Sequence, residues 1–423
     1  EKNLANGRQS VDYAYNIRGW LTGINSPDNL TAAGSGDAYA DLFGMRLAYN
    51  EATATGARPQ YNGNIAEAVW STGYGTPKRS AYGYSYDALN RLTGSDYWTT
   101  PASALANSTA YEERGITYDL NGNIRTLVRT QKNGDVLNDL SYTYSGNRLS
   151  AINGGAAYTY DRNGNMTTDG LRGFSVKYNQ LNLPERVSKG SDNISYIYSA
   201  TGTKLAMLNG TAVDNYYAGT CVYKGDRTLD YALHPEGVVR ATEEGLSPEY
   251  FLRDHLGNTR VVFSSTGAVL QTTDYYAFGM AHAPLPISNA NRYLYNGKEL
   301  QDATLDGERF DWYDYGARFY DAALGRWHSP DMMADLTYSW TPYRYAFNNP
   351  LRFIDPNGMT EEERITALQV ARSLLGSKYA SALPQNDRVT RGQLDCSGLV
   401  RYSIMQNESI NEPFNSKGNG VSQ

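Results

Sequence analysis

Cys396 is the residue whose surroundings most clearly indicate nucleophilic chemistry. It lies in the sequence Asp-Cys-Ser-Gly-Leu-Val, directly after Asp395, which is a good N-cap for the helix that we expect to follow. The positive end of a helix dipole lowers the pKa of a thiol, which favours the nucleophilic thiolate. The alternative is a small buried cysteine that packs at a helix N-terminus, which is the commoner role of a lone cysteine.

A cysteine nucleophile needs a base, usually a histidine that is oriented by a third polar group. No histidine lies in residues 397–423, so we expect this chain to contain only the nucleophile half of such a site. The histidines elsewhere are scattered among expected turns without the spacing of a metal site, and we expect neither a metal nor another cofactor. They are His234, His255, His282 and His328.

A repeated pattern, Tyr-x-Tyr-Asp/Asn followed by a short turn and an aliphatic residue, supplies most of the elements before residue 216. Alternating tyrosines place both rings on one face of a strand, and Asp or Asn with Asn-Gly suits a tight hairpin turn. The second tyrosine recurs every 16 to 32 residues, which favours hairpins of unequal length over a stacked solenoid. These tyrosines are Tyr86, Tyr118, Tyr144, Tyr160, Tyr178 and Tyr198. Residues 229–241 and 250–263 predict two further hairpins.

The composition supports a β-rich globular chain, with 36 tyrosines and 41 glycines among 423 residues. The net charge of −6 and the lack of a basic stripe argue against a nucleic-acid-binding protein. Two cysteines, Cys221 and Cys396, do not make a disulfide framework. No apolar run approaches the roughly 20 residues that a membrane-spanning helix needs. The chain begins without Met and without a signal peptide, so we expect a fragment or a processed product.

Three further motifs give the chain a resemblance to a known family. They are the hairpin RDHLGNTRVVF (253–263) and the blocks GARFYDAALGRWHSPD (316–331) and NNPLRFIDPNG (348–358). Together with the Tyr-Asp repeats, they resemble the Rhs/YD-repeat family and its repeat-associated core. The resemblance covers residues 9–359. It implies a mainly all-β fold, in which a spiralling antiparallel YD-repeat sheet forms part of a hollow shell. Because the shells of this family use longer chains, we expect part of the N-terminal wall to be missing.

The resemblance also predicts how the chain is divided. Residues 1–277 are expected to form the shell segment, and residues 278–359 the repeat-associated core, which plugs the shell and contains a self-cleavage region. Residues 360–423 are then the beginning of a cargo domain. The composition changes at this last boundary, where the block 293–359 is followed by a helical pattern.

In the Rhs family, two aspartates, each typically followed by Pro-x-Gly, cut the chain after the core by aspartyl-protease chemistry. The resemblance assigns this role to Asp331 and Asp355 and places the cut between Met359 and Thr360. Two carboxylates in close contact cannot both ionise readily, so the pair offers an acid and a base. Asp331 departs from the pattern because Met-Met-Ala follows it. The alternative is that Asp355-Pro-Asn-Gly is only a turn that closes the domain.

The tail has the pattern of a helix that begins at Thr360, where Thr360 and Glu363 form a capping box, and ends at Gly376. The tail combines this expected helix with the motifs Leu-Gly-x-x-Tyr and Asp-Cys-Ser-Gly-Leu-Val. Together these features resemble the NlpC-type cysteine peptidases, which are papain-like α+β enzymes that cleave cell-wall peptides. The resemblance implies that residues 360–423 are the N-terminal part of such a peptidase, with Cys396 as its nucleophile.

These resemblances imply a secreted or cell-surface Rhs-type polymorphic toxin, which encapsulates and releases a cysteine peptidase that acts on peptidoglycan peptides. The expected partners are its own C-terminal toxin, an immunity protein and a secretion machinery. One alternative is a cell-surface adhesion or carbohydrate-binding YD-repeat protein without catalysis, since tyrosine-rich sheets offer stacking surfaces for sugars. A third is a peptidase that remodels the wall of the cell that produces it.

Overall fold

The computed structural model of this chain describes residues 2–31, 39–73, 78–100, 105–282, 285–286, 291–359 and 361–363. The prediction that a helix begins at Thr360 is wrong at the residues that the structure describes, because Glu362–Glu363 form strand β34, where the extended backbone does not allow the expected Thr360–Glu363 capping box. The rest of that predicted helix and the segment around Cys396 lie outside the described residues. The chain divides into two units, Glu1–Tyr15 with Leu21–Glu362 and Asn16–Trp20 with Glu363–Gln423. The first unit contains two large sheets and residues 291–359, which we call the core segment.

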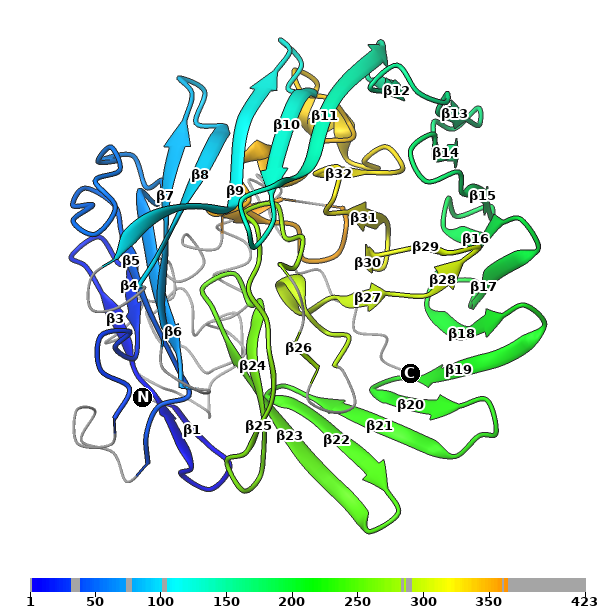
Figure 1. The fold of residues 1–423 in the computed structure, drawn as a ribbon. Coiled ribbons are helices and arrows are strands. Elements are labelled where there is room, and N and C mark those ends of the chain that lie inside the picture. Colours follow the sequence, from blue (N-terminus) through cyan, green and yellow to red (C-terminus); the bar gives the residue numbers. More distant parts are fainter. Residues whose placement is uncertain are drawn as a thin grey trace, which may run out of the picture. The chain divides into compact units, whose positions relative to one another are not determined.

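Ten antiparallel strands form the first sheet, and each pairs with its neighbour in sequence (Figure 1). They are β3 (Tyr13–Tyr15), β4 (Leu21–Ile24), β5 (Phe43–Ala48), β6 (Glu67–Thr72), β7 (Lys78–Tyr86), β8 (Leu92–Thr99), β9 (Ala106–Tyr118), β10 (Ile124–Thr130), β11 (Val136–Ser145) and β12 (Arg148–Ile152). Before this sheet, β1 (Lys2–Leu4) and β2 (Gln9–Val11) form a separate pair.

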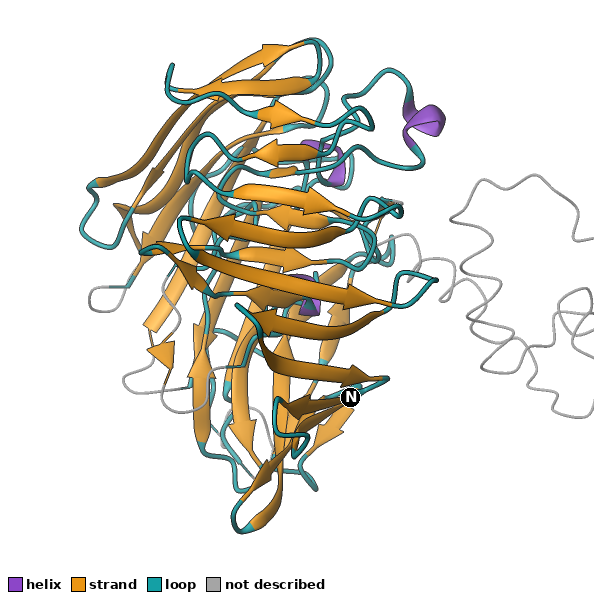
Figure 2. Cartoon of the chain, turned by 90° about the vertical axis from the view of Figure 1, so that its right-hand side faces the viewer, coloured by secondary structure: helices purple, strands orange, loops and turns teal. Residues whose placement is uncertain are grey.

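Fourteen strands form the second sheet on the same plan. They are β13 (Thr159–Tyr160), β14 (Met166–Thr168), β15 (Ser175–Tyr178), β16 (Pro184–Lys189), β17 (Asp192–Tyr198), β18 (Lys204–Asn209), β19 (Ala212–Ala218), β20 (Cys221–Lys224), β21 (Leu229–His234), β22 (Gly237–Thr242), β23 (Gly245–Arg253), β24 (Thr259–Ser264), β25 (Val269–Thr272) and β26 (Leu285–Pro286). The described residues are almost all strand or loop (Figure 2), which confirms the predicted mainly all-β fold of antiparallel hairpins. The hairpins predicted over 229–241 and 250–263 are β21–β22 and β23–β24.

The repeat turns owe their shape to the polar residue that follows the second tyrosine. At Asp119, the carboxylate oxygen Oδ1 accepts hydrogen bonds from the backbone amides of Asn121 and Asn123, both at 2.9 Å. Such a side chain replaces backbone partners and closes a tight turn without help from the rest of the fold. The same arrangement recurs at Asp87, Asn179, Ser199 and Asp254.

The tyrosines join each repeat to the one before it. Tyr142 and Tyr144, two residues apart on β11, pack side by side with ring centroids 6.4 Å apart. The Tyr144 hydroxyl donates to the carbonyl of Ile124, at the start of β10, at 2.7 Å. Tyr86, Tyr118 and Tyr198 donate to equivalent carbonyls of the preceding repeats. Because this contact involves only the ends of the hairpins, the hairpins can differ in length, which explains the variable spacing of the repeats.

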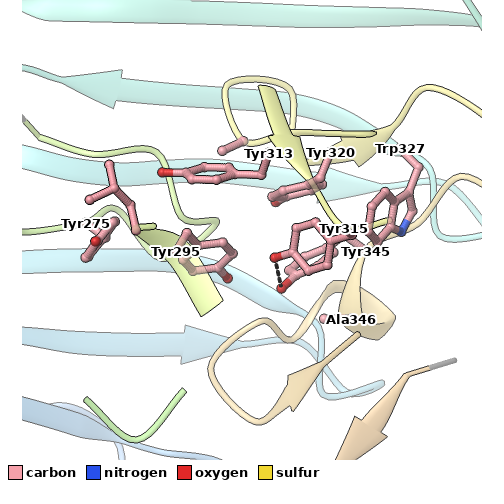
Figure 3. Packing of buried hydrophobic residues seen from close by; sticks show 10 residues of the cluster. Tyr275, Tyr295, Tyr313, Tyr315, Tyr320, Trp327, Tyr345 and Ala346 are labelled. Atoms are coloured by element: carbon pink, nitrogen blue, oxygen red, sulfur yellow. Dashed lines mark hydrogen bonds between the residues drawn. The ribbon is translucent and has the colours of Figure 1, made fainter. Parts of the chain in front are cut away.

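The core segment forms a small sheet in the order β27-β30-β31-β32. Its short elements are η1 (Tyr295–Gly297), β27 (Glu299–Gln301), β28 (Thr304–Leu305), β29 (Glu308–Arg309), β30 (Trp312–Asp314), β31 (Phe319–Asp321), β32 (Arg326–Trp327), η2 (Ala334–Thr337), η3 (Ala346–Asn348) and β33 (Phe353–Ile354), and the last described strand is β34 (Glu362–Glu363). Buried aromatic side chains fill its centre (Figure 3), where Tyr320 and Tyr345 stack with ring centroids 4.1 Å apart.

Buried cationic side chains connect the core segment to both large sheets, through backbone carbonyls at the first sheet and through ion pairs at the second. Arg129 of β10 pairs with Glu113 at 2.7 Å and also donates to the carbonyls of Ala322 and Ala323. From the second sheet, Lys204 of β18 contacts Glu299 and Asp314 of the core segment at 2.6 and 2.7 Å.

Replacing Arg129 by Met should therefore strongly destabilise the fold. The side chains of Arg129 and Glu113 are both 0% exposed, so the variant leaves an unpaired buried carboxylate, a change that costs about 3–5 kcal/mol. Denaturant unfolding of the full chain measures the loss. Lys177→Met is the matched control, because Lys177 and Glu185 form a pair with side chains 71% and 44% exposed, worth less than about 1 kcal/mol. Equal losses in the two variants would contradict the stabilising role of Arg129.

Candidate functional site

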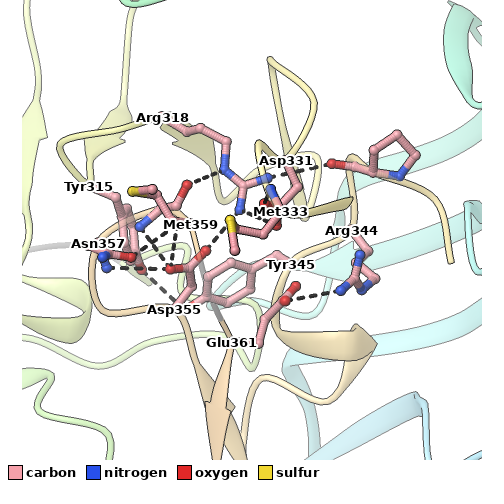
Figure 4. A network of polar contacts seen from close by, with 12 residues as sticks. Tyr315, Arg318, Asp331, Met333, Arg344, Tyr345, Asp355, Asn357, Met359 and Glu361 are labelled. Atoms are coloured by element: carbon pink, nitrogen blue, oxygen red, sulfur yellow. Dashed lines mark hydrogen bonds and ion pairs between the residues drawn. The ribbon is translucent and has the colours of Figure 1, made fainter. Parts of the chain in front are cut away.

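The turn at Asp355 ends directly before the predicted cut (Figure 4). Its carboxylate oxygen Oδ1 accepts hydrogen bonds from the backbone amides of Asn357, Gly358 and Met359 at 3.3, 2.8 and 3.0 Å. Gly358 has a φ of +78°, and a Cβ atom there would lie 3.0 Å from the amide nitrogen of Arg318. Glycine therefore allows both the left-handed backbone and the close approach to the core segment. The turn that Asp-Pro-Asn-Gly predicted is present.

Hydrogen-bond donors from other parts of the core segment contact the carbonyl oxygens of the same turn. Lys298 donates to the carbonyl of Pro356 at 2.6 Å, and the amide of Ala317 donates to that of Asn357 at 3.1 Å. The Nε atom of Arg318 donates to the carbonyl of Gly358 at 2.6 Å. The backbone that leads to Met359 is therefore fixed by donors and acceptors together, as a reaction on a neighbouring peptide bond requires.

Arg318 joins the two predicted catalytic aspartates. Its Nη2 atom lies 2.9 Å from Oδ2 of Asp331 and 2.9 Å from Oδ2 of Asp355. All three side chains are nearly inaccessible, with 1%, 3% and 0% exposed. The guanidinium also lies over the ring of Trp327, 4.2 Å from its centroid. The structure thus brings Asp331 and Asp355 to one site, despite the irregular motif at Asp331.

Arg318 adds a positive charge that the sequence-based prediction of an aspartate pair did not include. The expected pair shares a proton because two like charges repel. Here one cation contacts both carboxylates, and its charge compensates their repulsion. Because both Oδ2 atoms lie 2.9 Å from the same nitrogen, the two carboxylate oxygens are at most about 6 Å apart.

Asp331 is anchored by local contacts. Its amide donates to the carbonyl of Pro342 at 2.9 Å, and its Oδ1 atom accepts from the amide of Met333 at 2.7 Å. The Met-Met-Ala sequence that replaces Pro-x-Gly therefore still supplies a backbone amide to the carboxylate. Asp355, whose Oδ1 atom accepts three amides, is the more fully engaged of the two carboxylates.

Glu361, two residues beyond the predicted cut, lies against the core segment. Its Oε2 atom accepts a hydrogen bond from Nη2 of Arg344 at 3.0 Å. Burial raises the pKa of Glu361 to about 7, with a further upward contribution from Asp355, while Arg344 and Arg318 oppose the shift.

The other predicted site residues divide into two groups. Met359 is part of the described turn and is half-buried, whereas Thr360 and Cys396 lie outside the described residues. Among the described residues, no group of three or more His, Cys, Asp or Glu side chains could hold a metal ion. In the same part of the chain, no helix is long and apolar enough to cross a membrane.

Sequence reasoning missed Arg318, which joins the two aspartates. It also missed three neighbouring residues of the site, namely Lys298, Arg344 and Glu361. For Arg318 a signal was present, because it stands in the aromatic run that includes Trp312, Tyr313 and Phe319. An arginine within a run of core-forming residues must find a carboxylate or a carbonyl when it is buried. Which carboxylate it finds is not encoded locally, since Asp331 and Asp355 are 13 and 37 residues away.

Comparison with known proteins supports the repeat part of the resemblance. No family model matches the chain. It is 28% identical over 260 residues to the tRNA3(Ser)-specific nuclease WapA of Bacillus spizizenii, covering 57% of this chain and 11% of WapA. It is 28% identical over 306 residues to teneurin-3 of Danio rerio, covering 63% of this chain and 11% of teneurin-3. It is 31% identical over 157 residues to toxin subunit YenC2 of Yersinia entomophaga, covering 34% of this chain and 15% of YenC2.

Among solved structures, the TcdB2-TccC3-Cdc42 complex aligns with a TM-score of 0.38 and 18% identity, over 85% of this chain and 22% of that chain. The chain spans only about 11% of the length of the curated relatives WapA and teneurin-3. WapA and the teneurins are Rhs/YD-repeat proteins, and the NlpC-type resemblance of the tail has no counterpart in these matches. The chain is thus similar, through its repeats, to Rhs/YD-repeat proteins.

Replacing Arg318 by Met should destabilise the core segment by about 3–5 kcal/mol, because it leaves two buried carboxylates without their shared donor. Arg318→Lys should recover only part of this loss, since one ammonium group cannot reproduce the planar fork of donors. Denaturant unfolding of the full chain measures both. Arg309→Met is the control, because Arg309 pairs with Asp311 at the surface, with side chains 56% and 42% exposed. An Arg318→Met variant as stable as the control would contradict this account.

Proposed function

We propose that this chain is part of an Rhs-type toxin that carries a C-terminal segment and frees it by cutting its own backbone between Met359 and Thr360. The observation that supports this most is the buried cluster in which Arg318 contacts both Asp331 and Asp355 beside the turn that ends at Met359. A purely structural turn needs Asp355 but does not need a second buried aspartate and a shared arginine, both of which are costly to bury.

The geometry supports a hydrolytic reaction. The Oδ1 atom of Asp355 lies 3.0 Å from the amide nitrogen of Met359, and the carbonyl carbon of Met359 is two bonds further, so it lies within about 5.5 Å of that oxygen. Arg318 donates to the carbonyl of Gly358, one residue before the carbonyl that is attacked, so its positive charge lies close enough in the chain to favour the negative oxygen of a tetrahedral intermediate.

In the proposed reaction, Asp331 accepts a proton from a water molecule that lies between the two carboxylates. The water oxygen attacks the carbonyl carbon of Met359, and the bond from this carbon to the nitrogen of Thr360 then breaks. The proton held by Asp331 passes to that nitrogen. The products are a carboxyl group on Met359 and an amino group on Thr360; one hydrogen of the water stays on the new carboxyl group, the other reaches the nitrogen through Asp331, and no reagent besides water is consumed.

The cargo and partners follow from the same proposal. Residues 360–423 begin the cargo, and Asp-Cys-Ser-Gly-Leu-Val supports a cysteine peptidase in which Cys396 attacks cell-wall peptides. A secreted or cell-surface location, an immunity protein, a secretion machinery and an enclosing shell belong to this proposal. Two relatives, WapA and YenC2, are a nuclease and a toxin subunit, which is consistent with a toxin family that carries different cargoes.

Asp331→Asn should leave the full chain intact, because an amide cannot accept the proton of the attacking water. Asp355→Asn should also leave it intact, because it removes one of the two negative charges that hold Arg318 in the cluster. Denaturing electrophoresis and mass spectrometry should show a wild-type fragment that begins at Thr360. Asp335→Asn, in the same loop but outside the cluster, should be cut like the wild type. A wild-type chain that stays intact would refute self-cleavage and favour a non-catalytic adhesion or carbohydrate-binding role.

The cargo proposal predicts that iodoacetamide alkylates Cys396 about tenfold faster than Cys221 near pH 7, because a cysteine at a helix N-terminus has a depressed pKa. Cys221, a half-buried free thiol on β20, is a control within the same chain. Peptide mass spectrometry after timed quenching gives both rates. A Cys396 that reacts no faster than Cys221 would contradict its assignment as a nucleophile.

A further inference from the structure

Glu361 occupies a site built by the core segment. Its side chain is 4% exposed and that of its partner Arg344 is 1% exposed, and the two are joined at 3.0 Å. Arg344 is itself fixed, because Nη1 donates to the carbonyl of Thr341 at 3.2 Å and Nη2 donates to Oγ1 of Thr337 at 2.9 Å. Its guanidinium also lies over the ring of Phe347, 4.6 Å from the centroid. The guanidinium of Arg344 is therefore oriented by Thr341, Thr337 and Phe347 as well as by Glu361.

A second observation concerns the other oxygen of the same carboxyl group. Within the described residues, Oε1 of Glu361 is buried and has no hydrogen-bond partner. A buried carboxylate oxygen without a donor is costly, and the cost falls when the carboxyl group is protonated. The charged groups around it are Arg344 and Arg318, which are positive, and Asp355 and Asp331, which are negative.

We propose that the site around Arg344 is a subsite that receives an acidic side chain at the second position after the cut, and that Glu361 is a positioning residue for the cleavage. This inference rests on the proposed self-cleavage. The turn at Asp355 fixes the chain before the peptide bond between Met359 and Thr360, and the contact between Glu361 and Arg344 fixes it after. A peptide bond held from both sides spends more time in the geometry for attack.

The rate of the proposed cleavage should depend on pH, because the protonation state of Glu361 affects how well it binds in the subsite. The docked carboxyl has a pKa raised to about 7, from an ordinary value near 4.5, so docking takes up a proton. The favourable free energy that protonation of Glu361 adds to docking is fully available below about pH 4.5. It is lost as the pH rises through about 7. Cleavage should therefore slow as the pH rises towards and through about 7, and it should level off above that.

Self-cleavage of the full chain, followed between pH 5.5 and 8.5 by denaturing electrophoresis, tests the subsite. The wild-type rate should fall about tenfold across the titration of Glu361. Glu361→Gln, which resembles the protonated acid, should cleave at a rate that lacks this titration. Glu361→Ala and Arg344→Met should cleave at least about tenfold more slowly. Glu185→Gln, an exposed acid on β16, is the matched control and should keep the wild-type profile.

A readout that does not depend on cleavage separates this proposal from the one on which it rests. Hydrogen exchange of the amides of residues 357–362, measured in an Asp331→Asn chain, should accelerate when Glu361→Ala is added. A Glu361→Ala chain with the wild-type pH profile and unchanged exchange would overturn the subsite. A wild-type chain that is never cut would refute the cleavage proposal, and the exchange measurement would then still decide whether the Arg344 site holds Glu361.

Discussion

The requirement that buried cations meet carboxylates or carbonyls governs how the core segment is held. The desolvation cost of a buried charge is several kcal/mol, so each cation fixes the position of the segments that supply its partners. In this chain the partners come from distant parts of the sequence, and removing any one of them would leave a charge unpaired. The main pairs are Arg129 with Glu113, Arg172 with Asp321, Lys204 with Glu299 and Asp314, and Arg318 with Asp331 and Asp355. Arg172 and Lys204 link the second sheet to the core segment, and Arg129 links the first sheet to it through the carbonyls of Ala322 and Ala323, so the site at Arg318 depends on the whole arrangement.

Buried polar oxygens need hydrogen-bond donors, which explains why the chain uses tyrosine at positions where phenylalanine would also fill the core. Burial raises the pKa of Tyr315, Tyr320 and Tyr345 well above the ordinary value, so these phenols stay neutral and act as donors. Tyr320 donates to the carbonyl of Phe278 at 2.8 Å, and Tyr315 and Tyr345 both donate to Oδ1 of Asn296. In short strands that supply few ladder partners, a ring with a hydroxyl both packs and satisfies a carbonyl.

The site combines two kinds of constraint that differ in range. The turn at Asp355 is local, because a carboxylate accepts the amides of the next few residues and needs no outside partner. The position of Asp331 relative to Asp355 is not local, because it depends on Arg318 and on the small sheet that carries it. A site that joins a self-sufficient turn to a long-range ion cluster can form only when the core segment is complete. This arrangement restricts the proposed cleavage to the folded chain.

Local sequence patterns are enough to predict the antiparallel hairpins, their turns and the turn at Asp355. In each case the information lies within a few residues, in the alternation of tyrosines and in an Asp or Asn that accepts nearby amides. The sequence also identified Asp331 and Asp355, through motifs rather than geometry. Only the tertiary structure decided that Arg318 joins these two aspartates and that Arg344 binds Glu361. The reason is that a buried charge has to be paired, but the pairing partner is chosen by the packing of segments far apart in sequence, which no local pattern records.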